Sequence, residues 1–255
     1  MSLFAIRNLS VDVPGRRLLH DLTMELPPRR VTALIGHNGS GKSTLLKTLA
    51  RQIDGTGHIA FEGRALIDWN ARDYARRLAF LPQTTPPAEG MIVRELVALG
   101  RYPWHGALGR FGPRDHAAVA EALEECAVTD FADRLVDTLS GGERQRVWLA
   151  MMVAQQANTL LLDEPISALD VAHQVEVLSL VRRMCQDQSR SAIIVLHDVN
   201  MAARYCDHIV ALKAGRLAMQ GSPADLMRPA ALREIYGLPM DVLIRDDGLP
   251  VAVPA

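Results

Sequence analysis

Long hydrophobic runs are absent from the sequence. A helix needs about 20 consecutive apolar residues to cross a bilayer, and apolar runs such as Val31–Ile35 and Ala192–Leu196 are far shorter. We therefore expect no membrane-spanning segment. The first residues, MSLFAIRNLS, also lack the charged region, apolar stretch and small-residue cleavage site of a secretion signal. We expect the chain to remain in the cytoplasm after synthesis.

Cysteine is scarce. Cys126, Cys185 and Cys206 are odd in number and widely spaced, which fits neither a disulfide framework nor a CxxC metal site. We expect these residues to be buried free thiols.

A strong charge of either sign is also missing. The 28 basic and 29 acidic residues leave a formal net charge of −1, and only 5% of the residues are aromatic. A nucleic-acid-binding domain usually carries a basic surface, so we expect no nucleic-acid partner. The length of 255 residues suits a single large α/β domain, residues 1–255, which can carry a small insertion but not a second full domain.

The apolar patterning predicts a mixed α/β core. Residues 4–13 and 17–26 are patterned as β-strands around Pro14-Gly15, and residues 58–61 add a strand, so we expect an antiparallel N-terminal sheet. Continuous apolar runs indicate strands buried on both faces, with helical patterns between them. This alternation is typical of a mostly parallel core. The runs are residues 31–35, 159–162 and 192–196, and the helical patterns are residues 42–51, 143–157 and 171–186.

A helical insertion is expected at about residues 84–140. Its helical patterns, residues 92–100 and 115–127, are separated by the turn-rich stretch YPWHGALGRFGP. After residue 228 a short helix precedes a tail, residues 237–255, to which the sequence assigns no role.

Residues 36–44, GHNGSGKST, fit the phosphate-loop pattern G-x-x-x-x-G-K-[ST] and lie after a buried strand and before a helix, as that pattern requires. In such a loop, backbone N–H groups and a helix N-terminus surround phosphate oxygens. Lys42 would reach the β- and γ-phosphates and Ser43 would bind Mg²⁺. The expected phosphate-binding residues are Gly36, His37, Asn38, Gly39, Ser40, Gly41, Lys42, Ser43 and Thr44.

Polar residues follow three other apolar runs, residues 159–162, 192–196 and 78–81. Asp163 and Glu164 come directly after residues 159–162, at the strand end where parallel sheets bind ligands. Asp163 would hold Mg²⁺ or its water, and Glu164 would activate the attacking water. An Asp-Glu pair here is usually a helix cap, but the upstream phosphate loop favours catalysis. His197 could touch a γ-phosphate or be a hydrogen-bonded structural residue, and Gln83 could be a loop amide alone.

A second glycine-rich stretch, LSGGERQR at residues 139–146, has no neighbouring lysine. Its first residues would cap the helix predicted at 143–157, since a helix N-terminus exposes unsatisfied N–H groups. The same N–H groups could also bind phosphate oxygens.

The order of these motifs resembles that of the ATP-binding subunit of an ABC transporter. The order is phosphate loop, Gln83, LSGGERQR, LLLDEP, SALD and His197, over roughly residues 4–236. The resemblance implies a P-loop NTPase core of ABC type with an antiparallel β subdomain and an inserted helical subdomain. It also implies ATP hydrolysis with Mg²⁺, with Glu164 as general base and His197 as switch histidine. Ser43, Gln83 and Asp163 would hold the metal.

The resemblance further explains the second glycine-rich stretch. In this family two copies pack head to tail, so that the stretch of one copy closes over ATP held by the phosphate loop of the other. By this reading the residues that act in trans are Ser140, Gly141, Gly142, Glu143 and Asp170, with Asp170 at the dimer seam.

One position departs from the family pattern. Many members stack adenine on an aromatic residue about two dozen positions before the phosphate loop, where this chain has Val13. Base stacking on an aromatic ring contributes about 1–3 kcal/mol, so adenine is expected to be held more weakly or by another group such as Arg16. Ile166 replaces a commonly small polar residue and should matter less.

Residues 86–112 and 196–206 resemble importers of ferric siderophores, haem and cobalamin, and are most similar to the ferric-hydroxamate (ferrichrome-type) ATPases. The resemblance implies a separate integral-membrane permease, and indirectly a periplasmic or extracellular siderophore-binding protein. The subunit would lie peripherally on the cytoplasmic face of the inner membrane. The segment Tyr102–His105 could contact the permease or be a packed turn between helices.

Two alternatives remain open at this point. The importer could carry haem, cobalamin or another ferric siderophore. A soluble iron–sulfur assembly ATPase of the same family is the alternative from a different class. Pull-down from detergent-solubilised membrane separates the classes, because only an importer subunit should retain a polytopic permease.

Overall fold

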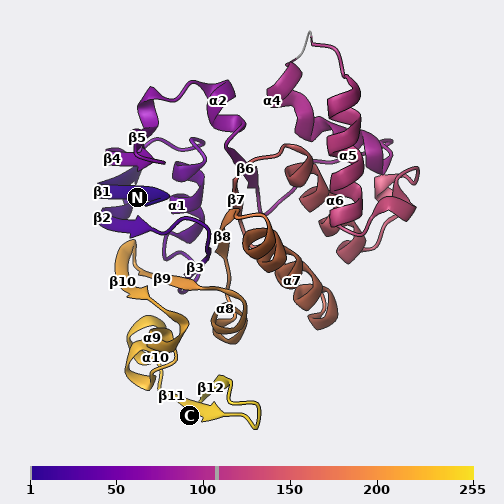
Figure 1. The fold of residues 1–255 in the computed structure, drawn as a ribbon. Helices are drawn as coiled ribbons and strands as arrows, with labels where there is room; N and C mark the ends of the chain where they lie inside the picture. The colour runs from indigo at the N-terminus through magenta and orange to yellow at the C-terminus, as the bar shows by residue number, and fades with distance from the viewer. Residues whose placement is uncertain (1, 107–108) are drawn as a thin grey trace. The chain divides into compact units, whose positions relative to one another are not determined.

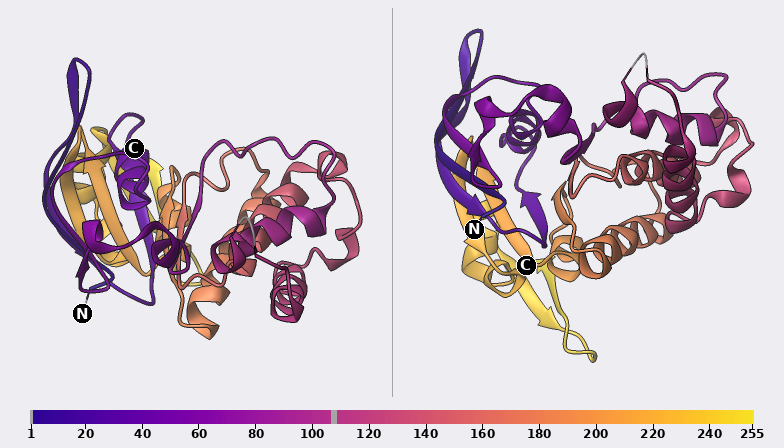
Figure 2. Two further views of the ribbon diagram at one scale, coloured as in Figure 1. Left: turned by 90° about the horizontal axis from the view of Figure 1, so that it is seen from above. Right: turned by 45° about the horizontal axis from the view of Figure 1, so that its top comes forward.

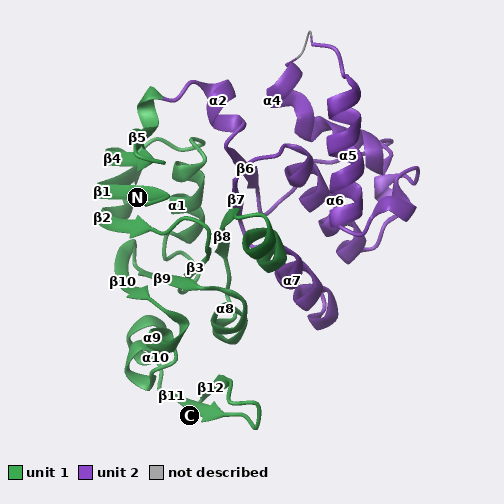
Figure 3. Ribbon diagram, viewed as in Figure 1, with its two compact units in different colours: residues 1–68, 181–255 green, residues 69–180 purple. Residues whose placement is uncertain are grey.

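A computed structural model describes residues 2–106 and 109–255 (Figure 1). Ala107 and Leu108, which belong to the predicted turn-rich stretch, lie outside the described residues. The chain divides into two compact units (Figure 3). Unit 1 contains residues 1–68 and 181–255, and unit 2 contains residues 69–180.

The antiparallel N-terminal sheet predicted from the sequence is present in unit 1. Its strands are β1 (Phe4–Val13), β2 (Arg16–Leu26), β4 (Thr56–Phe61) and the short β5 (Arg64–Ala65), in the order β2-β1-β4-β5. Phe4 pairs with Leu26 on one side and Phe61 on the other. The rings of Phe4 and Phe61 lie 4.8 Å apart between centroids and are fully buried, which fixes the register because a one-residue slip would expose both rings.

Parallel strands form the centre of unit 1. Strand β3 (Val31–Ile35) pairs in parallel with β8 (Ser191–Val195) and β9 (His208–Lys213), and β10 (Arg216–Gly221) pairs antiparallel with β9. Every residue of β3 and β8 is buried, as their continuous apolar runs predicted. Strand β3 leads through the phosphate loop into α1 (Lys42–Leu49).

The C-terminal part of unit 1 contains more structure than the sequence pattern indicated. After α8 (Val199–Tyr205) and α9 (Pro223–Leu226), the predicted short helix is α10 (Pro229–Tyr236). The tail then forms a hairpin of β11 (Met240–Ile244) and β12 (Pro250–Pro254). The right-hand view of Figure 2 shows this hairpin, in yellow, as an arm that leaves α9 and α10.

Unit 2 contains two parallel strands and most of the helices. Strand β6 (Leu78–Leu81) pairs in parallel with β7 (Thr159–Leu162). The predicted insertion consists of helices and short 3₁₀ turns. The predicted helix at residues 92–100 corresponds to α3 and part of the 3₁₀ turn that follows it, and the predicted helix at residues 115–127 corresponds to α5 with each end shifted by two residues. The helices of unit 2 as a whole are α2 (Ala71–Ala75), α3 (Val93–Ala98), α4 (Tyr102–His105), α5 (Pro113–Glu125), α6 (Gly141–Ala154) and the first part of α7 (Val171–Asp187). The 3₁₀ turns are Leu99–Arg101, Thr129–Phe131 and Val136–Thr138.

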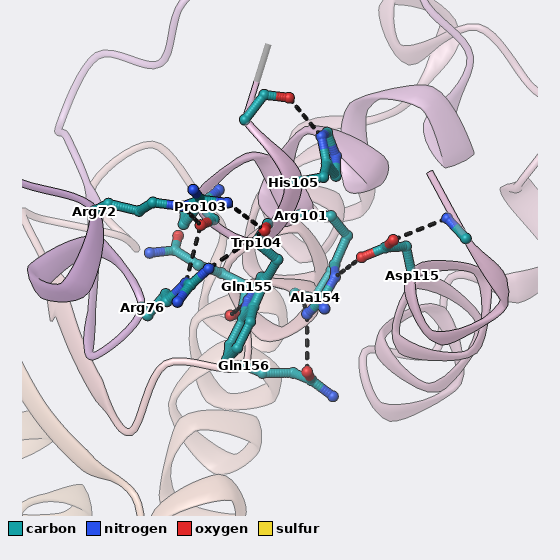
Figure 4. A network of polar contacts seen from close by, with 12 residues as sticks. Arg72, Arg76, Arg101, Pro103, Trp104, His105, Asp115, Ala154, Gln155 and Gln156 are labelled. Carbon is teal, nitrogen blue, oxygen red and sulfur yellow. Dashed lines mark hydrogen bonds and ion pairs between the residues drawn. The ribbon is translucent and has the colours of Figure 1, made fainter. Parts of the chain in front are cut away.

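A buried ion pair organises the insertion (Figure 4). Arg101 Nε donates to Asp115 Oδ1 at 2.9 Å, and Arg101 Nη1 donates to the Ala154 carbonyl and to Gln156 Oε1, each at 2.8 Å. Both side chains of the pair are almost inaccessible to solvent. The network therefore joins the 3₁₀ turn before α4 to α5 and to the end of α6.

Trp104 packs beside this ion pair. The guanidinium groups of Arg76 and Arg101 lie 4.9 and 5.0 Å from the Trp104 ring centroid, where cation–π attraction operates. Trp104 Nε1 donates to the Gln155 carbonyl at 2.8 Å. Tyr102, in the same short helix, is 58% exposed. The YPWH segment thus has one packed aromatic residue and one presented to solvent.

The predicted free thiols are confirmed for all three cysteines, which are buried. Burial raises the pKa of the Cys185 thiol to about 12 and raises that of Cys206 further. These thiols stay protonated at neutral pH and serve as small apolar residues of the core.

Across residues 2–106 and 109–255, no helix has the length and apolar character needed to cross a membrane.

Candidate nucleotide site

The phosphate loop of unit 1 is held tightly between β3 and α1. A side chain at Gly36 would overlap the backbone carbonyl of Leu212, and Gly36 has a φ of 134°, so only glycine fits there. The Lys42 side chain is buried, and its Nζ donates to the carbonyl oxygens of Gly36 at 2.8 Å and His37 at 2.9 Å. The loop is therefore curled around the lysine that the sequence assigns to phosphate binding.

Ser40 supports an anion site in this loop. Its side chain is buried, and its Oγ has no hydrogen-bond partner among the described residues. A buried hydroxyl without a partner costs about 1–3 kcal/mol, and a phosphate oxygen would accept a hydrogen bond from it. The remaining members of the predicted set, Asn38, Gly39, Gly41, Ser43 and Thr44, lie in the same loop and in the first turn of α1.

His197 also belongs to unit 1. It is exposed and lies two residues beyond the end of β8. The next residue, Asp198, is the N-cap of α8 and accepts hydrogen bonds from the backbone N–H of Asn200 at 2.7 Å and of Met201 at 3.0 Å. This cap satisfies two of the N–H groups that a helix start leaves open and fixes the turn that carries His197.

In unit 2 the structure brings Gln83 and Glu164 together. Gln83 follows β6, Glu164 follows β7, and Gln83 Nε2 donates to Glu164 Oε2 at 2.8 Å. Asp163 is fully buried, and its backbone N–H donates to the Leu81 carbonyl at 2.9 Å, which aligns the ends of the two strands. Glu164 has a φ of 52°. Such a left-handed conformation is costly for a side chain and is concentrated at functional sites.

The LSGGERQR stretch caps α6, as predicted. The Ser140 N–H donates to Glu143 Oε2 at 2.8 Å, and the Glu143 N–H donates to Ser140 Oγ at 3.3 Å, forming a capping box. The hydrogen bond from the Ser140 backbone lowers the pKa of Glu143 below its ordinary value. Helix α6 begins at Gly141, two residues earlier than the predicted helix.

A histidine that sequence reasoning missed supports this stretch. Gly142 lies so close to the His173 ring that any side chain at position 142 would overlap it. His173 is itself held by Asp170, whose Oδ1 lies 2.8 Å from His173 Nδ1 and accepts from the His173 N–H at 3.0 Å. The only sequence signal was the three-residue spacing of Asp170 and His173 at the start of a helix.

A cavity of about 290 Å³ in unit 2 joins the predicted residues. Gln83, Gly141, Glu164 and Ser167 line it, together with Arg144 and Trp148. It therefore collects side chains that follow β6 and β7 and the start of α6. It has room for water beside Glu164, which is what a general base requires.

Val13 ends β1, where it pairs with Arg16 across the turn at Pro14-Gly15. Arg16 is exposed. The predicted residues are thus distributed over both units. The phosphate loop and His197 lie in unit 1, and Gln83, Ser140–Glu143, Asp163, Glu164 and Asp170 lie in unit 2.

Residues 19–167 match the ABC transporter family, and the chain belongs to this family. It is 38% identical to the iron(3+)-hydroxamate import ATP-binding protein FhuC of Bacillus subtilis, over 95% of this chain and 91% of that protein. It is 40% identical to the ferric enterobactin transport ATP-binding protein FepC of Escherichia coli, over 92% and 87% of the two chains. Identity to the hemin import ATP-binding protein HmuV of Streptomyces coelicolor is 42%, over 94% and 85%.

Solved structures show the same fold. The fold is similar, with a TM-score of 0.87 and 25% identity, to a metal-chelate type ABC transporter in an inward-facing conformation, over 100% of this chain and 98% of that one. An ATP-binding cassette of an ABC transporter in its ADP conformation has a TM-score of 0.82 at 19% identity, over 92% and 98% of the two chains. The predicted fold class is confirmed, and the chain is an ATP-binding ABC ATPase.

Proposed function

We propose that this chain is the ATP-hydrolysing subunit that powers import of ferric hydroxamate siderophores through a separate membrane permease. The importer assignment is supported by relatives named as import or transport ATP-binding proteins, which match at least 92% of the chain. All three relatives are named for the import or transport of an iron chelate or haem, so an importer is favoured over a soluble iron–sulfur assembly ATPase.

The phosphate loop binds the triphosphate of ATP. Lys42 releases the carbonyl oxygens of Gly36 and His37 and turns its ammonium toward the β- and γ-phosphates, while Ser40 and the N–H groups of residues 36–44 donate to phosphate oxygens. Ser43, Gln83 and Asp163 are oxygen ligands of the type that Mg²⁺ prefers. When bound, Mg²⁺ neutralises negative charge that develops between the phosphates.

Glu164 acts as the general base. Its carboxylate is oriented by the hydrogen bond from Gln83 Nε2. Because Gln83 directly precedes the helical insertion in the chain, a change in this hydrogen bond during the ATP cycle can move the start of the insertion. Glu164 takes a proton from the attacking water, and His197 donates a hydrogen bond to the γ-phosphate. A positioned base contributes about 10²–10⁴-fold in rate.

A second copy of the chain completes each site. Ser140, Gly141, Gly142 and Glu143 of one copy close over ATP held by the other, and Asp170 lies at the seam. The capping box and the His173 contact support this role, because they hold the start of α6 in one conformation before nucleotide arrives. The permease would contact the helical insertion, with exposed Tyr102 as a contact residue, and would hold the subunit on the cytoplasmic face of the inner membrane.

Uptake of radioactive iron tests the function. A strain whose chromosomal gene for this chain is deleted should accumulate iron supplied as a ferric hydroxamate when the chain is expressed from a second copy of the gene. In a separate experiment, the chain should co-purify with a polytopic permease from detergent-solubilised membrane. Haem, cobalamin and a catecholate siderophore serve as competing substrates. Uptake of only one of these competitors would reassign the substrate, and co-purification with a soluble scaffold in place of a permease would refute the import function.

A further inference from the structure

The C-terminal segment of unit 1 contacts the phosphate loop. His37 is the second residue of the loop, and its Nε2 lies 2.8 Å from the backbone carbonyl of Tyr236, the last residue of α10. A carbonyl only accepts, so Nε2 carries the proton and donates. The two rings also meet edge to face, with centroids 5.6 Å apart. The end of α10 thus holds the loop through one hydrogen bond and one aromatic contact.

The same segment contacts the helix that follows His197. Asn200, in the first turn of α8, donates from Nδ2 to the Ala252 carbonyl at 3.1 Å and accepts at Oδ1 from the Ala252 N–H at 2.8 Å. An amide side chain is suited to this position because it offers a donor and an acceptor side by side. Ala252 is the buried residue of strand β12.

The sequence of β12 makes this contact specific. Backbone hydrogen bonds from Arg245 to Leu249 and from Ala255 to Pro239 set the ladder pattern, which turns the backbone nitrogens of positions 250, 252 and 254 outward. Positions 250 and 254 are proline and have no N–H to donate. Ala252 is therefore the position on this edge of β12 that keeps a donor, and Asn200 takes it.

The Tyr236 side chain is also influenced by the turn that carries His197. Burial, and secondly the nearby Asp198 carboxylate, raise the pKa of its phenol to about 12. Asp198 is the residue between His197 and α8. Tyr236 therefore contacts the phosphate loop through His37, and its phenol is close enough to the Asp198 carboxylate for an electrostatic interaction.

We propose that the C-terminal segment Pro229–Pro254 is a brace that positions the phosphate loop through Tyr236 and His37, and the His197 turn through Ala252 and Asn200. The inference rests on the proposed ATPase function and assigns a role to a segment that lies outside the nucleotide motifs. His37 and Asn200 act here as positioning residues, since they hold the backbone of the groups that meet ATP.

The two contacts should affect different kinetic constants. The phosphate loop binds ATP before hydrolysis, so a loosened loop raises the KM for ATP. The His197 turn acts at the γ-phosphate during hydrolysis, so a loosened turn lowers kcat. One hydrogen bond contributes about 0.5–1.5 kcal/mol net, which corresponds to a change of about two- to tenfold.

The first test compares two substitutions of His37 in the full-length chain assembled with its permease. His37→Phe keeps a flat ring against Tyr236 but removes the donor, and should raise the KM for ATP about two- to tenfold with kcat nearly unchanged. His37→Gln places an amide N–H at similar reach but has no ring to meet Tyr236, so its KM should lie between those of wild type and His37→Phe. An equal KM in His37→Phe and wild type, or equal impairment of both variants, would overturn the phosphate-loop contact.

The second test addresses the hairpin. Asn200→Ala removes both hydrogen bonds to Ala252 and should lower kcat about two- to tenfold with the KM unchanged. Ala252→Pro removes only the bond from the Ala252 N–H, at a position two residues from both Pro250 and Pro254, and should lower kcat by a smaller factor. The double variant should lose no more than Asn200→Ala alone, because both changes act on the same contact. Leu243→Ser, at a 56% exposed position of the same hairpin, is the matched control and should match wild type.

Three outcomes would overturn the brace. The hairpin would have no role in positioning the His197 turn if kcat were unchanged in Asn200→Ala or if the losses were additive in the double variant. The same conclusion would follow if the variants had a lowered melting temperature without a kinetic change. The wild-type complex separates this inference from the proposed function. If the wild-type complex hydrolyses no ATP the function itself fails, whereas normal wild-type turnover with unaffected variants removes the brace alone.

Discussion

At the scale of single residues, Glu164 combines two features expected of a general base. Its left-handed backbone is held against an intrinsic cost, and its carboxylate is oriented by Gln83 at 2.8 Å. A glutamine at this position could still accept through its amide oxygen, so the substitution removes basicity with little change in shape.

Glu164→Gln should therefore keep MgATP affinity within about twofold while hydrolysis falls by about 10²–10⁴-fold. Retained ATP should stabilise a closed dimer. Equilibrium nucleotide binding and steady-state ATPase activity in the permease complex measure the two effects. Wild-type turnover in this variant would remove Glu164 from the catalytic role.

Lys42 has two roles that one substitution removes together. Its buried Nζ holds the Gly36 and His37 carbonyl oxygens, and its charge is expected to bind phosphate. Lys42→Ala should weaken ATP binding and stop uptake. A cell with only this variant should fail to grow on a ferric hydroxamate as sole iron source but grow on free iron. Failure on both would indicate a general iron–sulfur defect instead.

The positions of the candidate site residues were predictable where a motif defines them, and their roles stay predictions. The phosphate loop, Gln83 and Glu164 follow from spacing and strand ends, and their local geometry agrees with that reading. His173, Asn200 and Tyr236 were missed, because each acts on a residue that only the fold brings near. Asn200 meets a backbone group 52 residues away, and no local pattern encodes such a pair.

At the scale of elements, continuous apolar runs predicted the buried strands β3, β7 and β8 well. The C-terminal hairpin was not predicted, since Pro250 and Pro254 oppose a strand assignment. They are tolerated because their nitrogens face away from β11. Proline excludes a strand only when its nitrogen faces a partner.

The buried Arg101–Asp115 pair should stabilise the insertion. Arg101→Met leaves the Asp115 carboxylate without its cation, and breaking a buried pair costs about 3–5 kcal/mol of unfolding free energy. Arg94→Met is the matched control, because Arg94 pairs with Asp133 at 2.7 Å on the exposed surface, where a pair contributes about 0–1 kcal/mol. Chemical denaturation measures both. Equal losses would show that the buried pair has no special role.

The same carboxylate predicts a pH dependence. The hydrogen bond from the Gly112 backbone, followed by Arg101, lowers the pKa of Asp115 below its ordinary value. A carboxyl with a lowered folded-state pKa adds stability above its unfolded-state pKa, and this stability is lost as the pH falls through the folded-state pKa. Acid unfolding of Asp115→Asn should therefore be less steep than that of wild type below about pH 4. Identical acid limbs would contradict this assignment.

At the scale of the whole molecule, the candidate site residues are distributed over two units, each built around its own strands. The capping box of α6 and the Asp170–His173–Gly142 contact give the LSGGERQR stretch a fixed conformation. Its sequence alone could not decide whether it serves only as a helix cap or also binds a second nucleotide, because both roles use the same N–H groups.

Mixed dimers decide between these roles. Lys42→Ala disables a phosphate loop, and Ser140→Arg disables the start of α6 by replacing its N-cap with a bulky side chain. Each homodimer should be inactive. If the stretch acts on the partner's nucleotide, a mixed dimer carries both lesions in one site and keeps the other site intact. If it acts on the nucleotide of its own chain, every site carries one lesion.

We therefore expect about one tightly held MgATP per mixed dimer, since one intact loop and one intact α6 start complete a single oxygen cradle. Retained nucleotide is the measurement, because transport could require both sites. Differently tagged subunits, co-purified in two steps within one permease complex, prove that the dimers are mixed. Verified mixed dimers that retain no more ATP than either parent would refute the shared site and leave the LSGGERQR stretch with its capping role alone.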